Sequence, residues 1–201
     1  MIGLKNYFWF FKGALTKKFC EDVIKHAQNI KEHTGKVKAE EEGFEEKKKA
    51  RLSTVKWLDD PWIFDEISPY VHTANKNAGW NFEWDWMENI QYTIYKEGQY
   101  YGWHTDDMQD AFGEKDHPNY QGKTRKLSVT VNLTDPNDYV GGDLEFDLRN
   151  NAIGRNIITM DEARDQGTIV VFPSFVPHQV RPVKKGTRFS LVIWNLGPPW
   201  K

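Results

Sequence analysis

The chain has 201 residues and a formal net charge of -2, so it has no overall positive charge with which to hold a nucleic-acid backbone. Aromatic residues make up 14% of the chain and include nine tryptophans, which excludes disorder over most of it and predicts a single globular domain, residues 1–201. Cys20 is the only cysteine, which excludes an intrachain disulfide and a cysteine-based zinc site.

The apolar segments are too short for a membrane protein. None approaches the roughly 18 consecutive apolar residues of a membrane span, and the apolar start of the chain has no convincing signal-peptide cleavage site. We therefore expect a soluble, cytoplasmic protein without a membrane partner.

Residues 1–81 are expected to form a strand and helical support. A strand at about 6–11 is followed by Thr16, which can cap a helix. The apolar positions after Thr16 recur at helical spacing and predict one buried face: Phe19, Cys20, Val23, Ile24, Ala27 and Ile30. Cys20 is therefore interpreted as a buried small hydrophobe rather than a nucleophile.

A second helix is predicted after a short strand at about 51–57. Asp60 can cap it, Pro61 suits its first position, and Gly79 lies past its end. Pro69 inside it predicts a kink. Its predicted buried stripe is Trp62, Ile63, Ile67, Val71 and Ala74.

Two polar segments are left without predicted structure. The charge run 36–50, KVKAEEEGFEEKKKA, is typical of a solvated loop or frayed helix, with a mobile substrate loop as the alternative. The long segment 107–124 is a candidate lid.

From residue 82 the hydrophobic pattern has a period of two. Seven segments predict strands separated by Gly, Pro, Asn or Asp turns: FEWDWMENIQYTIY, RKLSVTVNL, GDLEFDL, NIITM, GTIVVF, HQVRPV and RFSLVIWNL. So many strands in residues 82–201 predict a jelly-roll (double-stranded β-helix) core, with the N-terminal helices packed on one sheet. The predicted fold class is mainly β with α (α+β).

The segment 101–107, YGWHTDD, places His104 and Asp106 two residues apart. Along a strand edge, positions i and i+2 face the same side, so both side chains can point to one place. His178 in FPSFVPHQV is the best candidate for a third ligand. Two imidazoles and one carboxylate on one face of a metal, with other positions open, are the ligand set of non-haem Fe(II) oxygenases.

Arg188 follows His178 by ten residues and precedes Ser190. We expect His178 and Arg188 on successive antiparallel strands joined by the turn VKKG, residues 183–186. An inward arginine is costly unless it meets an anion, and a dicarboxylate would supply one.

Three blocks within residues 85–197 resemble the core of the 2-oxoglutarate and Fe(II)-dependent dioxygenases: QYTIYKEGQYYGWHTD, RKLSVTVNLTDPNDYVGGDLEF and GTIVVFPSFVPHQVRPVKKGTRFSLVIW. The prolyl 4-hydroxylase-like branch, with its bacterial PKHD-type hydroxylases, is the most similar. The resemblance implies that His104, Asp106 and His178 bind iron, and that Arg188 and Ser190 bind the distal carboxylate of 2-oxoglutarate.

The resemblance also implies that Tyr95 hydrogen-bonds the cosubstrate. Thr130 and Trp194 are pocket-lining candidates, with core packing as the other interpretation of Trp194, and Tyr101 can border the substrate pocket. The implied cofactors are Fe(II), 2-oxoglutarate and dioxygen, with ascorbate as a reductant.

The implied substrate is a prolyl residue of a peptide or protein. Alternatives are another side chain or a small molecule, a non-catalytic jelly-roll module that holds a metal, and a metal-assisted hydrolase, although no suitable Glu accompanies the triad. The nucleic-acid demethylase branch has a second arginine six residues after the first. Trp194 stands at that position here, which disfavours a nucleic-acid substrate.

Overall fold

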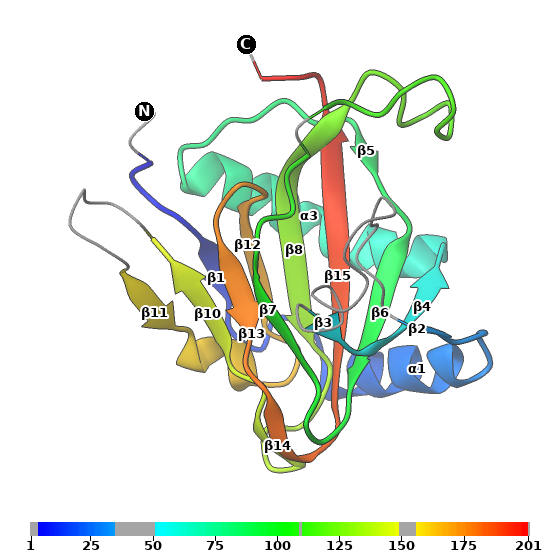
Figure 1. Ribbon diagram of the computed structural model, residues 1–201, viewed down its shortest axis with the longest axis vertical. Coiled ribbons are helices and arrows are strands. Elements are labelled where there is room, and N and C mark those ends of the chain that lie inside the picture. The colour runs from blue at the N-terminus through cyan, green and yellow to red at the C-terminus, as the bar shows by residue number, and fades with distance from the viewer. Residues whose placement is uncertain (1–3, 35–50, 109, 149–155, 201) are drawn as a thin grey trace.

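The computed structural model describes residues 4–34, 51–108, 110–148 and 156–200. Within them, a large and a small antiparallel sheet enclose the site, and two α-helices cover the outer face of the large sheet (Figure 1). This arrangement confirms the predicted fold class, mainly β with helical support.

The large sheet has eight strands. Seven form a path in the order β1 (Trp9–Phe11), β12 (Ile169–Pro173), β8 (Thr124–Asn132), β15 (Arg188–Gly197), β6 (Ile90–Tyr95), β4 (Thr54–Leu58) and β2 (His33–Thr34), and β5 (Trp86–Met87) also pairs with β15.

The small sheet has five strands, in the order β11 (Ile157–Thr159), β10 (Leu144–Asp147), β13 (His178–Val180), β7 (Tyr100–His104) and β3 (Arg51–Leu52). A separate two-stranded sheet pairs β9 (Tyr139–Gly141) with β14 (Val183–Gly186), and a short 3-10 helix spans Asp161–Arg164.

Helix α1 (Lys17–Gln28) begins as predicted, because the Thr16 hydroxyl accepts a hydrogen bond from the Phe19 amide at 3.1 Å. Cys20, Val23 and Ala27 are buried against the large sheet, and the other three predicted positions pack partly buried beside them. Burial raises the pKa of the Cys20 thiol to about 11, so this side chain is an inert part of the core.

Helix α3 (Pro61–Asn77) also begins at the predicted residue, and Ile63, Ile67, Val71 and Ala74 are buried. The predicted burial of Trp62 is wrong, because its side chain is 39% exposed. Trp62 is in the first turn of the helix, and its ring makes an edge-to-face contact with Phe19 of α1 instead of packing against the sheet. The Asp60 carboxylate contacts His26 rather than a helix amide, and the kink at Pro69 stays a prediction.

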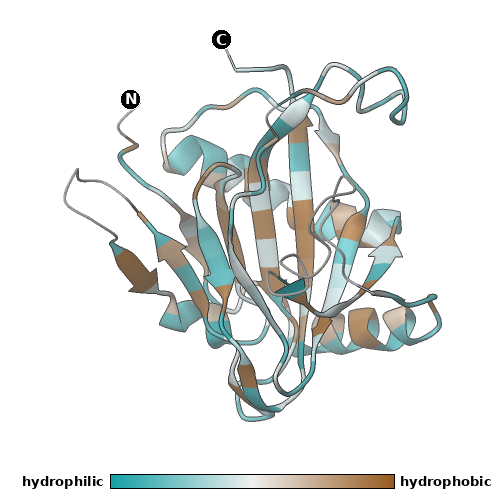
Figure 2. Ribbon diagram, in the orientation of Figure 1, coloured by the Kyte–Doolittle hydropathy of each residue, from teal (hydrophilic) through white to brown (hydrophobic). Residues whose placement is uncertain are grey.

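Alternation gives the central strands two different faces. On β8, Leu127, Val129 and Val131 belong to the core under the helices, whereas Ser128 and Thr130 lie on the opposite face. Figure 2 shows hydrophobic residues alternating with less hydrophobic ones along the middle of β8. The helix-covered face carries the main core, and the other face turns toward the small sheet.

Two predicted strand connections are wrong. The strand expected at 51–57 is two strands of different sheets, because Arg51 pairs with Tyr101 in the small sheet and Thr54 pairs with Ile94 in the large one. The expected turn 183–186 is β14, so His178 and Arg188 lie on strands of different sheets. Pro182, which has no amide proton for a ladder, separates β13 from β14 and helps to end the pairing of β13.

The charge run 36–50 lies outside the described residues. Within the part of the chain that the structure describes, no helix is both long enough and apolar enough to cross a membrane.

Replacing Gly167 with Ala should destabilise the protein strongly. Gly167 has φ +77°, and an added Cβ would lie in hard contact with the Leu15 carbonyl oxygen. Left-handed strain and the clash together should lower the free energy of unfolding by about 3 kcal/mol, measured by urea denaturation. Gly79→Ala is the matched control, because Gly79 has φ +75° with open space around it, and it should lose only about 1 kcal/mol. Equal losses would contradict the packing explanation.

Candidate metal centre and its two cavities

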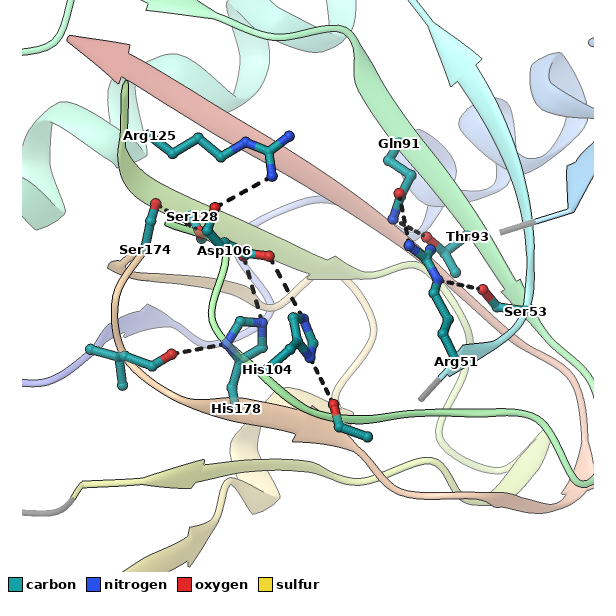
Figure 3. A network of polar contacts seen from close by, with 12 residues as sticks. Arg51, Ser53, Gln91, Thr93, His104, Asp106, Arg125, Ser128, Ser174 and His178 are labelled. Carbon is teal, nitrogen blue, oxygen red and sulfur yellow. Dashed lines mark hydrogen bonds and ion pairs between the residues drawn. The ribbon is translucent and has the colours of Figure 1, made fainter. Parts of the chain in front are cut away.

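His104, Asp106 and His178 lie together between the sheets. His104 ends β7, Asp106 follows it by two residues, and His178 begins β13, directly opposite His104 in the strand register. Asp106 Oδ1 is 3.7 Å from His104 Nε2, and Asp106 Oδ2 is 3.6 Å from His178 Nε2. Figure 3 shows both imidazole rings directed at the carboxylate.

Backbone carbonyls orient both imidazoles. His104 Nδ1 is 2.7 Å from the Gly102 oxygen, and His178 Nδ1 is 3.0 Å from the Val176 oxygen. Because a carbonyl oxygen only accepts, each Nδ1 must carry the proton and donate it. Each Nε2 is then left with a lone pair facing Asp106, which is the form in which histidine binds a metal.

The charge states also suit a metal. Burial and the nearby His178 lower the pKa of His104 to about 3, so its ring is neutral at ordinary pH. Burial works against ionisation of Asp106, but His178, His104, Arg125 and the Ser128 hydroxyl outweigh it and hold the pKa of the carboxyl below its usual range. The triad therefore offers two neutral nitrogens and one anionic oxygen.

The Asp106 carboxylate needs a further partner. Its Oδ2 is buried and has no hydrogen bond, although its backbone amide donates to the Ser174 carbonyl at 2.8 Å. One ligand atom from each of the three residues lies within 4.8 Å of the others. A divalent cation would satisfy the unpaired oxygen and both Nε2 atoms, so the residues present fit the metal that the sequence implies.

A smaller, inner cavity adjoins the triad. All nine predicted site residues line it: Tyr95, Tyr101, His104, Asp106, Thr130, His178, Arg188, Ser190 and Trp194. The three metal-ligand candidates come from the small sheet and from the residues that follow β7. Arg188, Ser190 and Trp194 lie on one face of β15 in the large sheet. Thr130 of β8 and Tyr95 of β6 complete the large-sheet wall.

Arg188 is the cation of the inner cavity. It is 3% exposed, pairs in register with Tyr95, and carries its guanidinium 5.8 Å from the centre of that ring. Among the described residues, no carboxylate forms an ion pair with it. A buried, uncompensated guanidinium calls for an anionic ligand.

A second, outer cavity of about 620 Å³ opens beside the first. Gln91, Tyr101, Asp106 and Trp194 line both cavities and form the wall between them. The predicted lid segment 107–124 supplies one side of the outer cavity, with Asp107, Met108, Phe112, Asp116, His117 and Tyr120. The segment is thus a wall of the cavity, and its closure stays a prediction.

Sequence reasoning missed four polar residues of the outer cavity, namely Arg51, Glu88, Gln91 and Arg125. Arg125 binds both oxygens of Glu88, at 2.6 and 2.9 Å, and stacks over Trp194 at 3.7 Å. Gln91 lies two and four residues before Thr93 and Tyr95, so strand alternation could have placed it beside Tyr95. Nothing in the sequence links Glu88 to Arg125, which pair only because β15 brings them together.

Three comparisons agree with this geometry. The family model described as the 2OG-Fe(II) oxygenase superfamily matches residues 90–195, just over half of the chain. A PKHD-type hydroxylase of Teredinibacter turnerae is 32% identical over 104 residues, which is 52% of this chain and 41% of that relative. A PKHD-type hydroxylase of Idiomarina loihiensis is 31% identical over 100 residues, covering 50% and 38% of the two chains. The chain thus matches only about two fifths of the length of these relatives.

Solved structures share the fold. A Pseudomonas putida prolyl-4-hydroxylase has a TM-score of 0.69 and 19% identity, with 95% of this chain and 93% of that one covered. A viral collagen prolyl hydroxylase from Paramecium bursaria Chlorella virus-1 has a TM-score of 0.65 and 20% identity, with 96% and 97% covered. These similarities place the chain in the predicted double-stranded β-helix fold.

Replacing Asp106 with Asn should abolish metal binding, because the substitution removes the only anionic ligand atom and keeps the side-chain shape. In the wild type, Fe(II) added without oxygen at a hundred times its dissociation constant should stabilise the fold by about 2.7 kcal/mol and raise the melting temperature. The variant should show no rise. Asp107→Asn changes an exposed neighbouring carboxylate and should keep the rise; loss of the effect in both variants would argue against the triad.

Proposed function

The chain belongs to the 2OG-Fe(II) oxygenase superfamily, and from this premise we propose that it hydroxylates a prolyl residue of a peptide or protein while converting 2-oxoglutarate to succinate. The proposal for the prolyl substrate is supported by the names of the relatives, which include PKHD-type hydroxylases and, among structures of the same fold, prolyl hydroxylases.

The observation that carries the proposal is the pairing of two features in one cavity. The triad of His104, Asp106 and His178 lies on one wall, and the unpaired guanidinium of Arg188 lies on another. A site that only held a structural metal would have no use for a second, buried cation, whose desolvation is costly. A dicarboxylate cosubstrate accounts for both features, since one end suits a metal and the other suits an arginine.

The chain's residues have distinct roles in this proposal. His104, Asp106 and His178 would hold Fe(II), and Arg188 with Ser190 would bind the distal carboxylate of 2-oxoglutarate. Tyr95 lies beside Arg188 in the strand register, and Thr130 lines the same cavity. When bound, Fe(II) would activate dioxygen, which by itself reacts too slowly with a C–H bond.

The overall reaction balances without another reductant. One oxygen atom of dioxygen enters succinate as 2-oxoglutarate loses carbon dioxide, and the other enters the substrate C–H bond as a hydroxyl group. The chain must exclude water from the site and hold the reacting groups together. The buried apolar residues Phe172, Leu144 and Val180 around the inner cavity exclude water.

Removal of the Arg188 charge should weaken cosubstrate binding. Arg188→Met should raise the dissociation constant for 2-oxoglutarate about 100-fold, because a desolvated carboxylate loses its charged partner. Arg188→Lys keeps the charge but not the two-pronged geometry and should cost about tenfold. Calorimetric titration of the Fe(II) form without oxygen measures both values, and succinate formation under air should fall in the same order.

Arg181→Met is the matched control for these variants. Arg181 is an exposed arginine 3.9 Å from Glu145, outside both cavities, and its loss should leave binding and succinate formation unchanged. A wild-type protein that neither binds 2-oxoglutarate nor forms succinate would overturn the proposed cosubstrate. Succinate formation with no oxygen added to any prolyl peptide, read by mass spectrometry, would overturn the prolyl substrate alone.

A further inference from the structure

Besides Arg188 in the inner cavity, a buried arginine, Arg51, lines the outer cavity, and the proposed reaction gives it no role. Arg51 is 8% exposed and lines the outer cavity but not the inner one. It reaches this place because the chain crosses from the small sheet to the large sheet directly after it, between β3 and β4. Figure 3 shows its guanidinium beside Gln91, away from the triad.

Neutral groups fix the guanidinium of Arg51. Its Nε donates to the Ser53 hydroxyl at 2.8 Å, and one terminal nitrogen, Nη1, donates to Gln91 Oε1 at 3.3 Å. The other terminal nitrogen, Nη2, is buried without a hydrogen-bond partner. Neither contact neutralises the charge, and a buried donor without an acceptor is costly, so the site is incomplete as the structure describes it.

Among the described residues around the two cavities, Arg51 is the buried charged side chain that has no counter-charge once the proposed metal and cosubstrate are bound. Arg125 is neutralised by both oxygens of Glu88. Asp106 would bind the metal, Arg188 would bind the cosubstrate, and the charges of a divalent metal and a dicarboxylate cancel. The loop acids of the outer cavity do not replace a partner, because Asp107 is exposed and the Asp116 carboxylate accepts from the Gly113 amide.

The position of Arg51 relates the missing anion to the reacting group. The guanidinium lies over the Tyr101 ring, 4.6 Å from its centre, and the same ring stacks on His104 with 3.5 Å between ring centres. The Tyr101 ring thus contacts both Arg51 and His104, a candidate metal ligand. An anion bound there would lie near the reacting carbon without being the group that reacts.

We propose that Arg51 binds a carboxylate of the prime substrate, so that the protein selects substrates with an acidic group close to the residue that is hydroxylated. This inference rests on the 2-oxoglutarate-dependent hydroxylation in the proposed function, and it adds a substrate class to that reaction. The carboxylate is either the side chain of an Asp or Glu flanking the target residue or the α-carboxylate of a small substrate such as a free amino acid. Both sources present the planar pair of oxygens that a guanidinium recognises.

The test is a set of anaerobic calorimetric titrations of the Fe(II) and 2-oxoglutarate-loaded protein, in which no turnover occurs. One arm uses blocked peptides with a central proline and Glu at one flanking position, each compared with the same peptide carrying Gln. The other arm uses free L-proline compared with L-prolinamide. In at least one arm the acid should bind the wild type about tenfold or more tightly than its amide, and Arg51→Gln should reduce the preference below about twofold.

Arg181→Gln is the control and should keep the full preference, since this arginine is exposed and lines neither cavity. If Arg51→Gln does not fold, Arg51→Lys takes its place and should retain part of the preference. Equal binding of acid and amide by the wild type in both arms, absence of binding in both arms, or a full preference in the Arg51→Gln variant would each overturn the inference. Failure of the proposed function would instead appear as missing 2-oxoglutarate binding or succinate formation.

Discussion

Packing of the two helices against one face of the large sheet determines where the chemistry of this protein can lie. Leu191 and Ile193 of β15 are buried beneath the helices, so the residues between and beside them, Ser190 and Val192, must face the other way. A slip of one residue in the pairing of β15 would bury the polar set and expose the apolar set. The hydrophobic core therefore holds the cosubstrate side of the site in register.

The two sheets contribute different parts of the site. The small sheet and the residues that follow β7 contribute the whole metal triad, whereas the large sheet contributes Arg188 and Ser190. A second apolar cluster, which includes Phe146 and Phe172, packs between the sheets and keeps the two halves at a fixed separation. Phe172 also contacts the ring of His178 edge-on at 4.6 Å, so the packing that joins the sheets also restrains a ligand candidate. Stability and site geometry depend on the same side chains.

Local sequence patterns predicted the elements well and their connections poorly. The Thr16 cap and most of the buried faces of both helices follow from short-range patterns, which the sequence displays directly. The identification of Arg188 and Ser190 rests on the family resemblance, because the hairpin expected to place Arg188 beside His178 is wrong. The division at Ser53 and the pairing of β14 with β9 depend on which distant strand offers a partner, and that information is not local. The same holds for the buried Arg51 and for the Glu88–Arg125 pair, whose members are 37 residues apart. The prediction that Trp62 is buried was wrong for another reason. Helical periodicity predicts which face of the helix a side chain lies on, but not whether the sheet extends beneath that position.

The crossing at Ser53 also has an evolutionary consequence. The family match covers residues 90–195, which contain the triad and Arg188, whereas the shape of nearly the whole chain is shared with distant solved structures. The N-terminal part covers an apolar face, a task that many different sequences perform equally well. Arg51 belongs to that N-terminal part, outside the family match, but it reaches the outer cavity because the crossing carries it between the sheets. Substitutions there can change what the protein selects without altering the residues that perform the oxidation, so selectivity and chemistry can diverge independently among descendants of one ancestor.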